Sequence, residues 1–162
     1  MLIFALVLGS LASPPIDVCI LLTPDDVRVL QHVSIKERKA SHTIGQQMSF
    51  GQCFFEADDF VRSVTVGLIS THETRGDGRT VQAYWKDTFE SAEDENPAHS
   101  IAGVGQAAFW VGDARAGSLY VLTDSVILRI SVGGVDNEPE RIRRSQALAW
   151  IALNRLAKGR RP

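Results

Sequence analysis

Two cysteines carry the most definite chemistry in this chain. Cys19 and Cys53 are the only cysteines, and 34 positions separate them. In an exported protein, an even and low number of cysteines is typical of a structural disulfide. In a cytosolic protein the same residues would be two buried thiols. We therefore predict a Cys19–Cys53 disulfide if the chain is exported, linking the start of the mature domain to a strand.

The residues that commonly act as bases or metal ligands show no catalytic spacing. The chain has no G-x-S-x-G nucleophile motif, and its histidines are His32, His42, His72 and His99. The pair His72-Glu73 begins like a zinc-protease helix, but Gly76 stands where the second histidine is required. The sequence thus assigns no catalytic residue, no metal ligand and no cofactor. An enzyme whose site is assembled only in space remains the alternative.

One segment has the letters of a dinucleotide-binding motif. Gly103 to Ala108, GVGQAA, fits G-x-G-x-x-A. That motif must follow a strand and open a helix. Here it follows a proline-containing loop and leads into Phe109-Trp110-Val111, a strand-like run. We expect a turn that lets the chain enter a sheet, with Trp110 packed in the core.

The composition predicts an ordinary globular domain. The 162 residues are 44% hydrophobic and 22% charged, so residues 13–162 are expected to form a single domain. The net charge of -2 disfavours nucleic acid as a partner. No apolar run approaches the roughly 20 residues that a transmembrane helix needs, so no membrane span is expected.

The first twelve residues resemble the later part of a secretory signal peptide. An apolar run, Leu2 to Leu8, precedes the small-residue pattern Ser10-Leu11-Ala12. We predict cleavage after Ala12 and a periplasmic or secreted location. The alternative is that this run forms a buried N-terminal strand.

Three helices are predicted. Thr23 caps the first, Pro24 to His32, in which Pro24, Asp25 and Asp26 suit the first turn. The second runs from Thr80 to about Glu93. Its apolar stripe is Val81, Trp85 and Phe89. The last helix follows Asn137, and the apolar positions expected to lie on the sheet are Ile142, Ala149, Ala152, Leu153 and Leu156, with Trp150 at the margin.

Basic residues of this last helix and the tail are expected along its other side. They are Arg141, Arg143, Arg144, Arg155, Lys158, Arg160 and Arg161. A solvated outer face explains them. A peripheral contact of the basic C-terminal helix with anionic lipid or an acidic partner is the alternative.

Strands are expected over Thr43 to Glu56, over Ser63 to Ser70 and three times within Gly103 to Gly134. The segment Ile35 to Lys39 is expected to be a charged turn that follows the first helix. If Asp124 and Ser125 form a turn, one core face carries Leu119, Val121, Thr123, Val126, Leu128, Ile130 and Val132. Tyr120, Ile127, Arg129 and Ser131 then line a partly wet face. The predicted fold class is α+β, an antiparallel sheet of about five strands with helices packed on it, in the order α-β-β-α-β-β-β-α.

Three segments resemble a known family. Cys19 to Val27 (CILLTPDDV), Cys53 and Gly103 to Trp110 (GVGQAAFW) are similar to segments of the DUF3558-like small exported bacterial envelope proteins, whose function is unknown. This sequence departs from them at Gln106, where an acid is usual, and in having no lipobox before Cys19. The resemblance implies an envelope protein and supplies no catalytic residue.

The sequence therefore predicts an exported, non-enzymatic binding or accessory protein of the cell envelope. Its partner would be an unknown envelope component or a small ligand. The alternatives are a hydrolase with a site assembled only in space and a structural envelope interaction protein.

Overall fold

The computed structural model describes residues 16–71, 80–90, 98–113, 115–134 and 136–159. Its helices are α1 (Pro24–Gln31), α2 (Val81–Trp85) and α3 (Glu138–Gly159), with short turns η1 (Val18–Ile20), η2 (Phe60–Arg62) and η3 (Lys86–Glu90). Its strands are β1 (Ile35–Ile44), β2 (Met48–Ala57), β3 (Val64–Thr71), β4 (His99–Ser100), β5 (Ala107–Gly112), β6 (Gly117–Leu122) and β7 (Val126–Val132).

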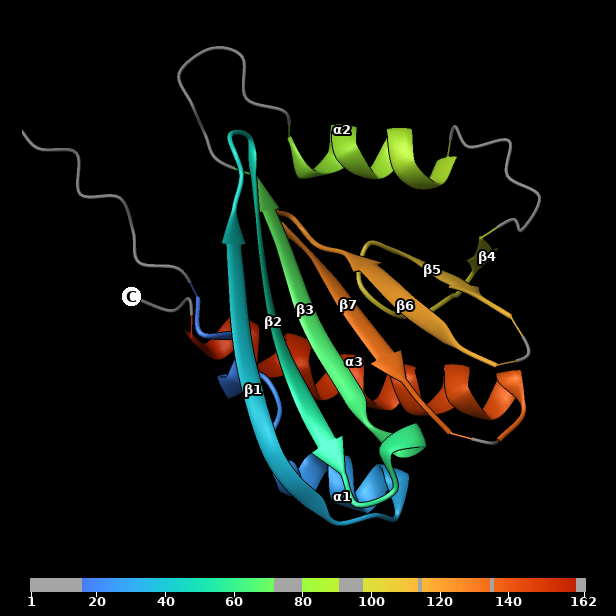
Figure 1. Ribbon diagram of the computed structural model, residues 1–162. Coiled ribbons are helices and arrows are strands. Elements are labelled where there is room, and N and C mark those ends of the chain that lie inside the picture. The colour runs from blue at the N-terminus through green and yellow to red at the C-terminus, as the bar shows by residue number, and fades with distance from the viewer. Residues whose placement is uncertain (1–15, 72–79, 91–97, 114, 135, 160–162) are drawn as a thin grey trace, which may run out of the picture.

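The strands form one antiparallel sheet in the order β1-β2-β3-β7-β6-β5-β4. Helices α1 and α3 pack on one face, here called the inner face, and α2 packs on the opposite, outer face (Figure 1). The α+β class is therefore as predicted. The described residues contain seven strands rather than about five, because β1 and β4 were not anticipated.

The two edge strands account for this difference. The segment predicted as a charged turn, Ile35 to Lys39, is the first half of β1, a ten-residue strand that pairs with β2. All of β1 except Ile35 is exposed, so no alternation of buried side chains marks it as a strand. At the other edge, β4 has only two residues, and its strand character comes from pairing with β5. Both elements are defined by backbone pairing rather than by side-chain pattern.

A capping box starts α1 where the sequence predicted. The Thr23 hydroxyl accepts the Asp26 backbone N–H at 3.2 Å, and the Asp26 carboxylate accepts the Thr23 backbone N–H at 2.6 Å. Pro24 occupies the first turn. His32 ends the helix in the left-handed conformation, with a φ of 53°. The helix places Val27 in the inner-face core.

The β6–β7 hairpin supplies the centre of that core. Asp124 and Ser125 form the predicted turn, and the residues buried on the inner face are Leu119, Val121, Val126, Leu128, Ile130 and Val132. Thr123 does not join this face. Its hydroxyl donates to the Val126 carbonyl at 2.8 Å and closes the turn.

The outer face carries a second core beside the partly wet surface that the sequence predicted. Ile127 is fully buried there, beneath α2, in a core that also holds Val81, Trp85 and Leu122. The stripe predicted from Val81, Trp85 and Phe89 is thus confirmed as a packing surface. The helix itself is shorter than predicted, since regular α structure ends at Trp85 and a π turn continues to Glu90. The rest of the predicted helix lies outside the described residues.

Helix α3 lies along the inner face, against β6 and β7. Of its predicted stripe, Ala149, Ala152 and Leu156 are buried, and Ile142 and Leu153 pack against the core from its margin. Trp150 points outward and is 49% exposed. None of the described helices is long and apolar enough to cross a membrane.

Two arginines of α3 do not lie on the predicted basic side. Arg141 and Arg144 are 1% and 8% exposed. Arg141 donates to the backbone carbonyls of Asp136 and Asp113 at 2.5 and 2.7 Å. Arg144 binds the carboxylates of Asp136 and Glu140. The prediction was wrong for these two residues because their guanidinium groups reach acceptors that sequence position does not reveal.

Candidate functional site

The two cysteines form the covalent link that the sequence predicted. Their sulfur atoms lie 1.99 Å apart, the distance of a disulfide bond, and the two Cα atoms are 5.0 Å apart. Cys19 belongs to η1 and Cys53 to the middle of β2. Both are buried in the inner-face core. This bond fixes the segment before α1 onto the sheet and exposes no reactive thiol.

The other residues that the sequence singled out are not brought together. His32 lies at the end of α1, while His42 and His99 lie on β1 and β4, the opposite edges of the sheet. His72 lies outside the described residues. The G-x-G segment is a turn that enters β5, with φ of 80° at Gly103 and 61° at Gly105. Trp110, which follows it, is buried in the core and donates to Glu138 Oε1 at 2.6 Å.

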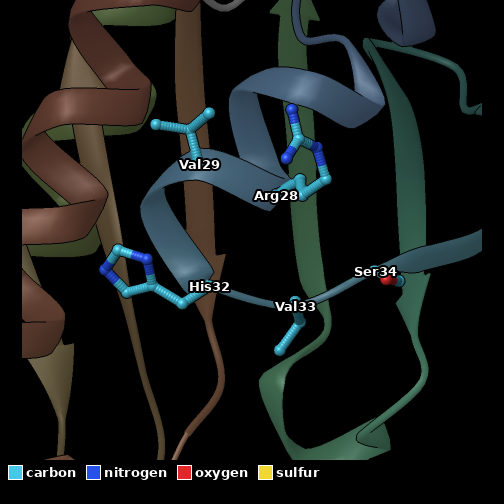
Figure 2. Close-up of a pocket in the computed structure, with 5 residues that line it drawn as sticks. All are labelled: Arg28, Val29, His32, Val33 and Ser34. Carbon is cyan, nitrogen blue, oxygen red and sulfur yellow. The ribbon is translucent and has the colours of Figure 1, made fainter.

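An open hollow of about 490 Å³ lies beside the end of α1. Its lining residues are Arg28, Val29, His32, Val33 and Ser34 (Figure 2). They come from one continuous segment, and the labelled side chains of Val29 and Val33 point away from each other. Arg28 Nε is paired with Asp25 Oδ1 at 3.2 Å. The polar side chains of Arg28, His32 and Ser34 extend in different directions and do not converge on a ligand position (Figure 2).

The part of the outer face that α2 leaves uncovered has a more organised chemistry. Alternation along the strands places Thr65, Arg129 and Ser131 on the same face as Ile69 and Ile127, which lie under α2. Likewise, Ser118 shares the face of Tyr120 and Leu122 on β6. We call Thr65, Ser118, Arg129 and Ser131 the polar patch.

Three hydroxyl groups of the polar patch form a row across three strands. Thr65 on β3 is opposite Ser131 on β7, and Ser131 is opposite Ser118 on β6. Side chains directly opposite one another in an antiparallel pair have Cβ atoms about 5 Å apart. Ser118 Oγ and Ser131 Oγ are 2.6 Å apart and share a hydrogen bond. The row is thus a continuous strip of hydroxyl groups.

Arg129 stands beside this row and is held in place by two contacts. Its Nε donates to Ser118 Oγ at 3.2 Å, and its guanidinium carbon lies 5.8 Å from the centre of the Tyr120 ring. A cation at that distance from an aromatic ring is stabilised by the ring's electrons. The part of the chain that the structure describes provides no acceptor for the two terminal nitrogens of Arg129. The arginine is positioned by one nitrogen and presents the other two.

Aromatic residues flank the polar patch on both sides. Toward α2, the Tyr120 ring is 4.9 Å from that of Phe89, which also contacts Phe109. Toward β1, the rings of Phe54 and Phe60 are 6.0 Å apart, and Phe54 is opposite Thr65. Phe60 is 67% exposed. The patch therefore lies between a packed aromatic cluster and a partly open one.

A second cation near the patch is already neutralised. Lys39 on β1 is opposite Phe54. Its Nζ lies 2.7 Å from Glu37 Oε1 and 2.9 Å from Glu56 Oε2. Hydrogen bonds to Glu37 and Glu56 raise the pKa of Lys39 above its ordinary value. Arg129, by contrast, forms no ion pair with a carboxylate among the described residues.

Sequence reasoning placed Tyr120, Arg129 and Ser131 on one face but gave them no role. The signal was present in β7, where VILRISV sets one charged residue inside a run of buried apolar positions. A charge in a central strand requires a partner, a ligand or a solvated face. Which of these applies depends on the neighbours across the sheet, which the sequence of one strand does not contain.

Comparison of the chain with known proteins finds no matching family model, no matching curated protein and no matching solved structure. The site must therefore be interpreted from its own geometry.

Proposed function

We propose that the protein is an exported, non-enzymatic binding protein of the bacterial cell envelope, and that it binds through the uncovered part of its outer face. Export is supported by the disulfide, since such bonds persist in oxidising compartments. It is also supported by the apolar segment at the start of the sequence, which lies outside the described residues, and by the resemblance to exported envelope proteins.

The observation that carries the choice of surface is the unpaired end of the Arg129 guanidinium. A side chain that is held by Ser118 and Tyr120 has already lost much of its rotamer freedom. A ligand that binds it loses less entropy than one that must order a free arginine. The surrounding hydroxyl row and aromatic residues add polar and apolar contact area to the same surface.

The alternative surface, the outward side of α3, has less support. Arg141 and Arg144 are buried, and Arg155 binds the Asp26 carboxylate at 2.5 and 3.2 Å. Arg143 is exposed but paired with Glu140 at 2.6 Å. The predicted arginines at positions 160 and 161 lie outside the described residues. Most of the described positive charge that suggested a contact with anionic lipid or an acidic partner is therefore used inside the protein.

Export can be tested by the intact mass of protein purified from a periplasmic fraction, with and without reductant and alkylation. We expect a mass that begins at Ser13 and two thiols that react only after reduction. A protein that retains its first twelve residues and has two reactive thiols would contradict export. Cys19 and Cys53 would then be thiols of a cytosolic protein.

The binding surface can be tested by titrating isotope-labelled protein with muramyl dipeptide, N-acetylglucosamine oligomers and anionic lipid vesicles. We expect at least one probe to shift the backbone resonances of β3, β6 and β7. The variant Thr65→Trp should block this binding by filling the polar patch. Its matched control is Asn154→Trp, on the exposed side of α3, which should leave the binding unchanged. Shifts confined to α3 would show that the proposed surface is wrong.

A further inference from the structure

The hydrogen-bonding capacity of the polar patch is biased toward donors. Because Ser118 Oγ accepts the Arg129 N–H, its own hydrogen is free to point to Ser131 Oγ, 2.6 Å away. Ser131 then has its own hydrogen to donate outward. Together with the terminal nitrogens of Arg129 and the Thr65 hydroxyl, the patch offers several donors on one surface. The complementary ligand group is one with several acceptor oxygens.

The charge of the polar patch indicates which charge the complementary ligand group should carry. Arg129 contributes one positive charge, while the two carboxylates of Glu37 and Glu56 more than offset the single charge of Lys39, so that group adds no positive charge to the patch. A single unpaired guanidinium matches a single negative charge. A dianionic phosphate would keep an unbalanced charge on this surface. The structure therefore favours a monoanion.

The geometry of Arg129 further restricts the chemical class of the anionic ligand group. With Nε bound to Ser118, the two terminal nitrogens are left as a planar pair. Such a pair binds a carboxylate with two parallel hydrogen bonds, an arrangement stronger and more directional than one bond. Phe54 and Phe60 on one side and Tyr120 on the other offer apolar surface beside it.

We propose that Arg129 is a carboxylate-binding residue, and that the ligand is a carboxylate whose adjoining apolar part lies on the Phe54–Phe60 side of the polar patch. This inference rests on the proposed function, because it names the ligand class for the same surface. Thr65 and Ser131 act as further donors to the carboxylate oxygens.

The test compares three small probes of matched shape by resonance titration of the labelled protein. The probes are 3-phenylpropionate, its neutral amide 3-phenylpropanamide, and phenyl phosphate. We expect 3-phenylpropionate to bind at the polar patch more tightly than either other probe. Arg129→Gln should weaken its binding about tenfold or more, since hydrogen bonds to charged groups are the strong ones. Arg129→Lys keeps the charge but loses the planar pair, and should also weaken it.

The control variant is Arg143→Gln, which removes an exposed arginine from α3 and should leave the affinity unchanged. Thermal unfolding of each variant establishes that it is folded. Equal binding of the acid and the amide, or acid binding that Arg129→Gln does not weaken, would overturn the carboxylate assignment. Tighter binding of phenyl phosphate would instead identify a phosphate site. If envelope components still bind the outer face of Arg129→Gln, the ligand class is wrong and the proposed surface stands.

Discussion

At the scale of single residues, Asp26 joins two helices through one carboxylate. It completes the capping box of α1 with Thr23 and accepts two hydrogen bonds from Arg155 of α3. Burial disfavours its ionised form, but the hydrogen bonds from Arg155 and Thr23 outweigh burial and lower the pKa of Asp26 below its ordinary value. Its contribution to stability therefore depends on ionisation.

We predict that Asp26→Asn lowers the free energy of unfolding by about 1 to 2 kcal/mol at neutral pH, because it removes the charged pair with Arg155 and weakens the hydrogen bond from the Thr23 backbone N–H. Because the folded-state pKa is depressed, this stabilisation is present above the unfolded pKa. The stabilisation is lost as the pH falls through the pKa of Asp26 in the folded protein. Denaturant unfolding of both proteins should show their difference narrowing below about pH 4. A difference that stays constant at acid pH would contradict the ionic contribution.

Gly103 and Gly105 differ in a way that a matched pair of variants can measure. Both have positive φ, which costs a residue with a Cβ about 1 kcal/mol. A Cβ on Gly103 meets nothing within 4 Å. On Gly105 it would lie 2.3 Å from Val121 Cγ1 and 2.7 Å from the Leu122 carbonyl oxygen.

We predict that Gly103→Ala destabilises the protein by about 1 kcal/mol and Gly105→Ala by about 3 kcal/mol or more, since the second also displaces the β6 backbone. Unfolding in denaturant measures both. Equal effects would show that Gly105 is required only for its backbone conformation.

At the scale of elements, α3 is tied to the rest of the fold by buried arginines. Arg144 binds Asp136 and Glu140 and donates to Gln31 Oε1 at 2.9 Å. Gln31 in turn donates to the carbonyls of Arg62 and Gly133. One buried network thus connects α1, α3 and the loop after β7.

Adjacent arginines of α3 give a controlled test of this network. Arg144→Met leaves the buried Gln31 Oε1 and the partly exposed Asp136 carboxylate without this partner, and we expect it to cost about 1 to 3 kcal/mol. Arg143→Met removes an exposed arginine paired only with Glu140, and should change stability far less. Similar values for the two variants would mean that the buried network contributes little.

At the scale of the whole molecule, the disulfide connects the start of the described chain to the middle of the sheet. It closes a segment that contains α1, β1 and half of β2, with a sequence separation of 34. Loop entropy gives such a link about 3 to 4 kcal/mol of stabilisation. Edge strand β1 lies within the closed segment, so the bond restrains the part of the sheet that has a neighbour on one side only.

We predict that the double variant Cys19→Ser/Cys53→Ser has a melting temperature lower by roughly 10 °C. In a chain of this size, a loss of about 3 to 4 kcal/mol of stability corresponds to a shift of about this magnitude. Reductant should lower the melting temperature of the wild type toward the same value and leave the double variant unchanged. A wild type that does not respond to reductant under unfolding conditions would contradict the stabilising role of the bond.

Local patterns in the sequence were enough to predict the parts whose structure depends on near neighbours. The cap of α1, the turn at Asp124 and the buried face of β6 and β7 all rest on contacts within a few residues or on alternation along one strand. For an exported chain, the sequence also predicted the pairing of the two cysteines, because the chain contains no third cysteine.

Only the tertiary structure decided the rest, because it depends on what lies opposite each residue. The charged segment at Ile35 became a strand through its pairing with β2. Arg144 of α3 turned inward because acceptors from α1 and the loop before α3 lie beside it. Arg129 became the centre of the candidate site because Ser118 and Tyr120 of the neighbouring strand hold it. Such long-range partners leave no periodic signal in the sequence, whereas burial and capping do.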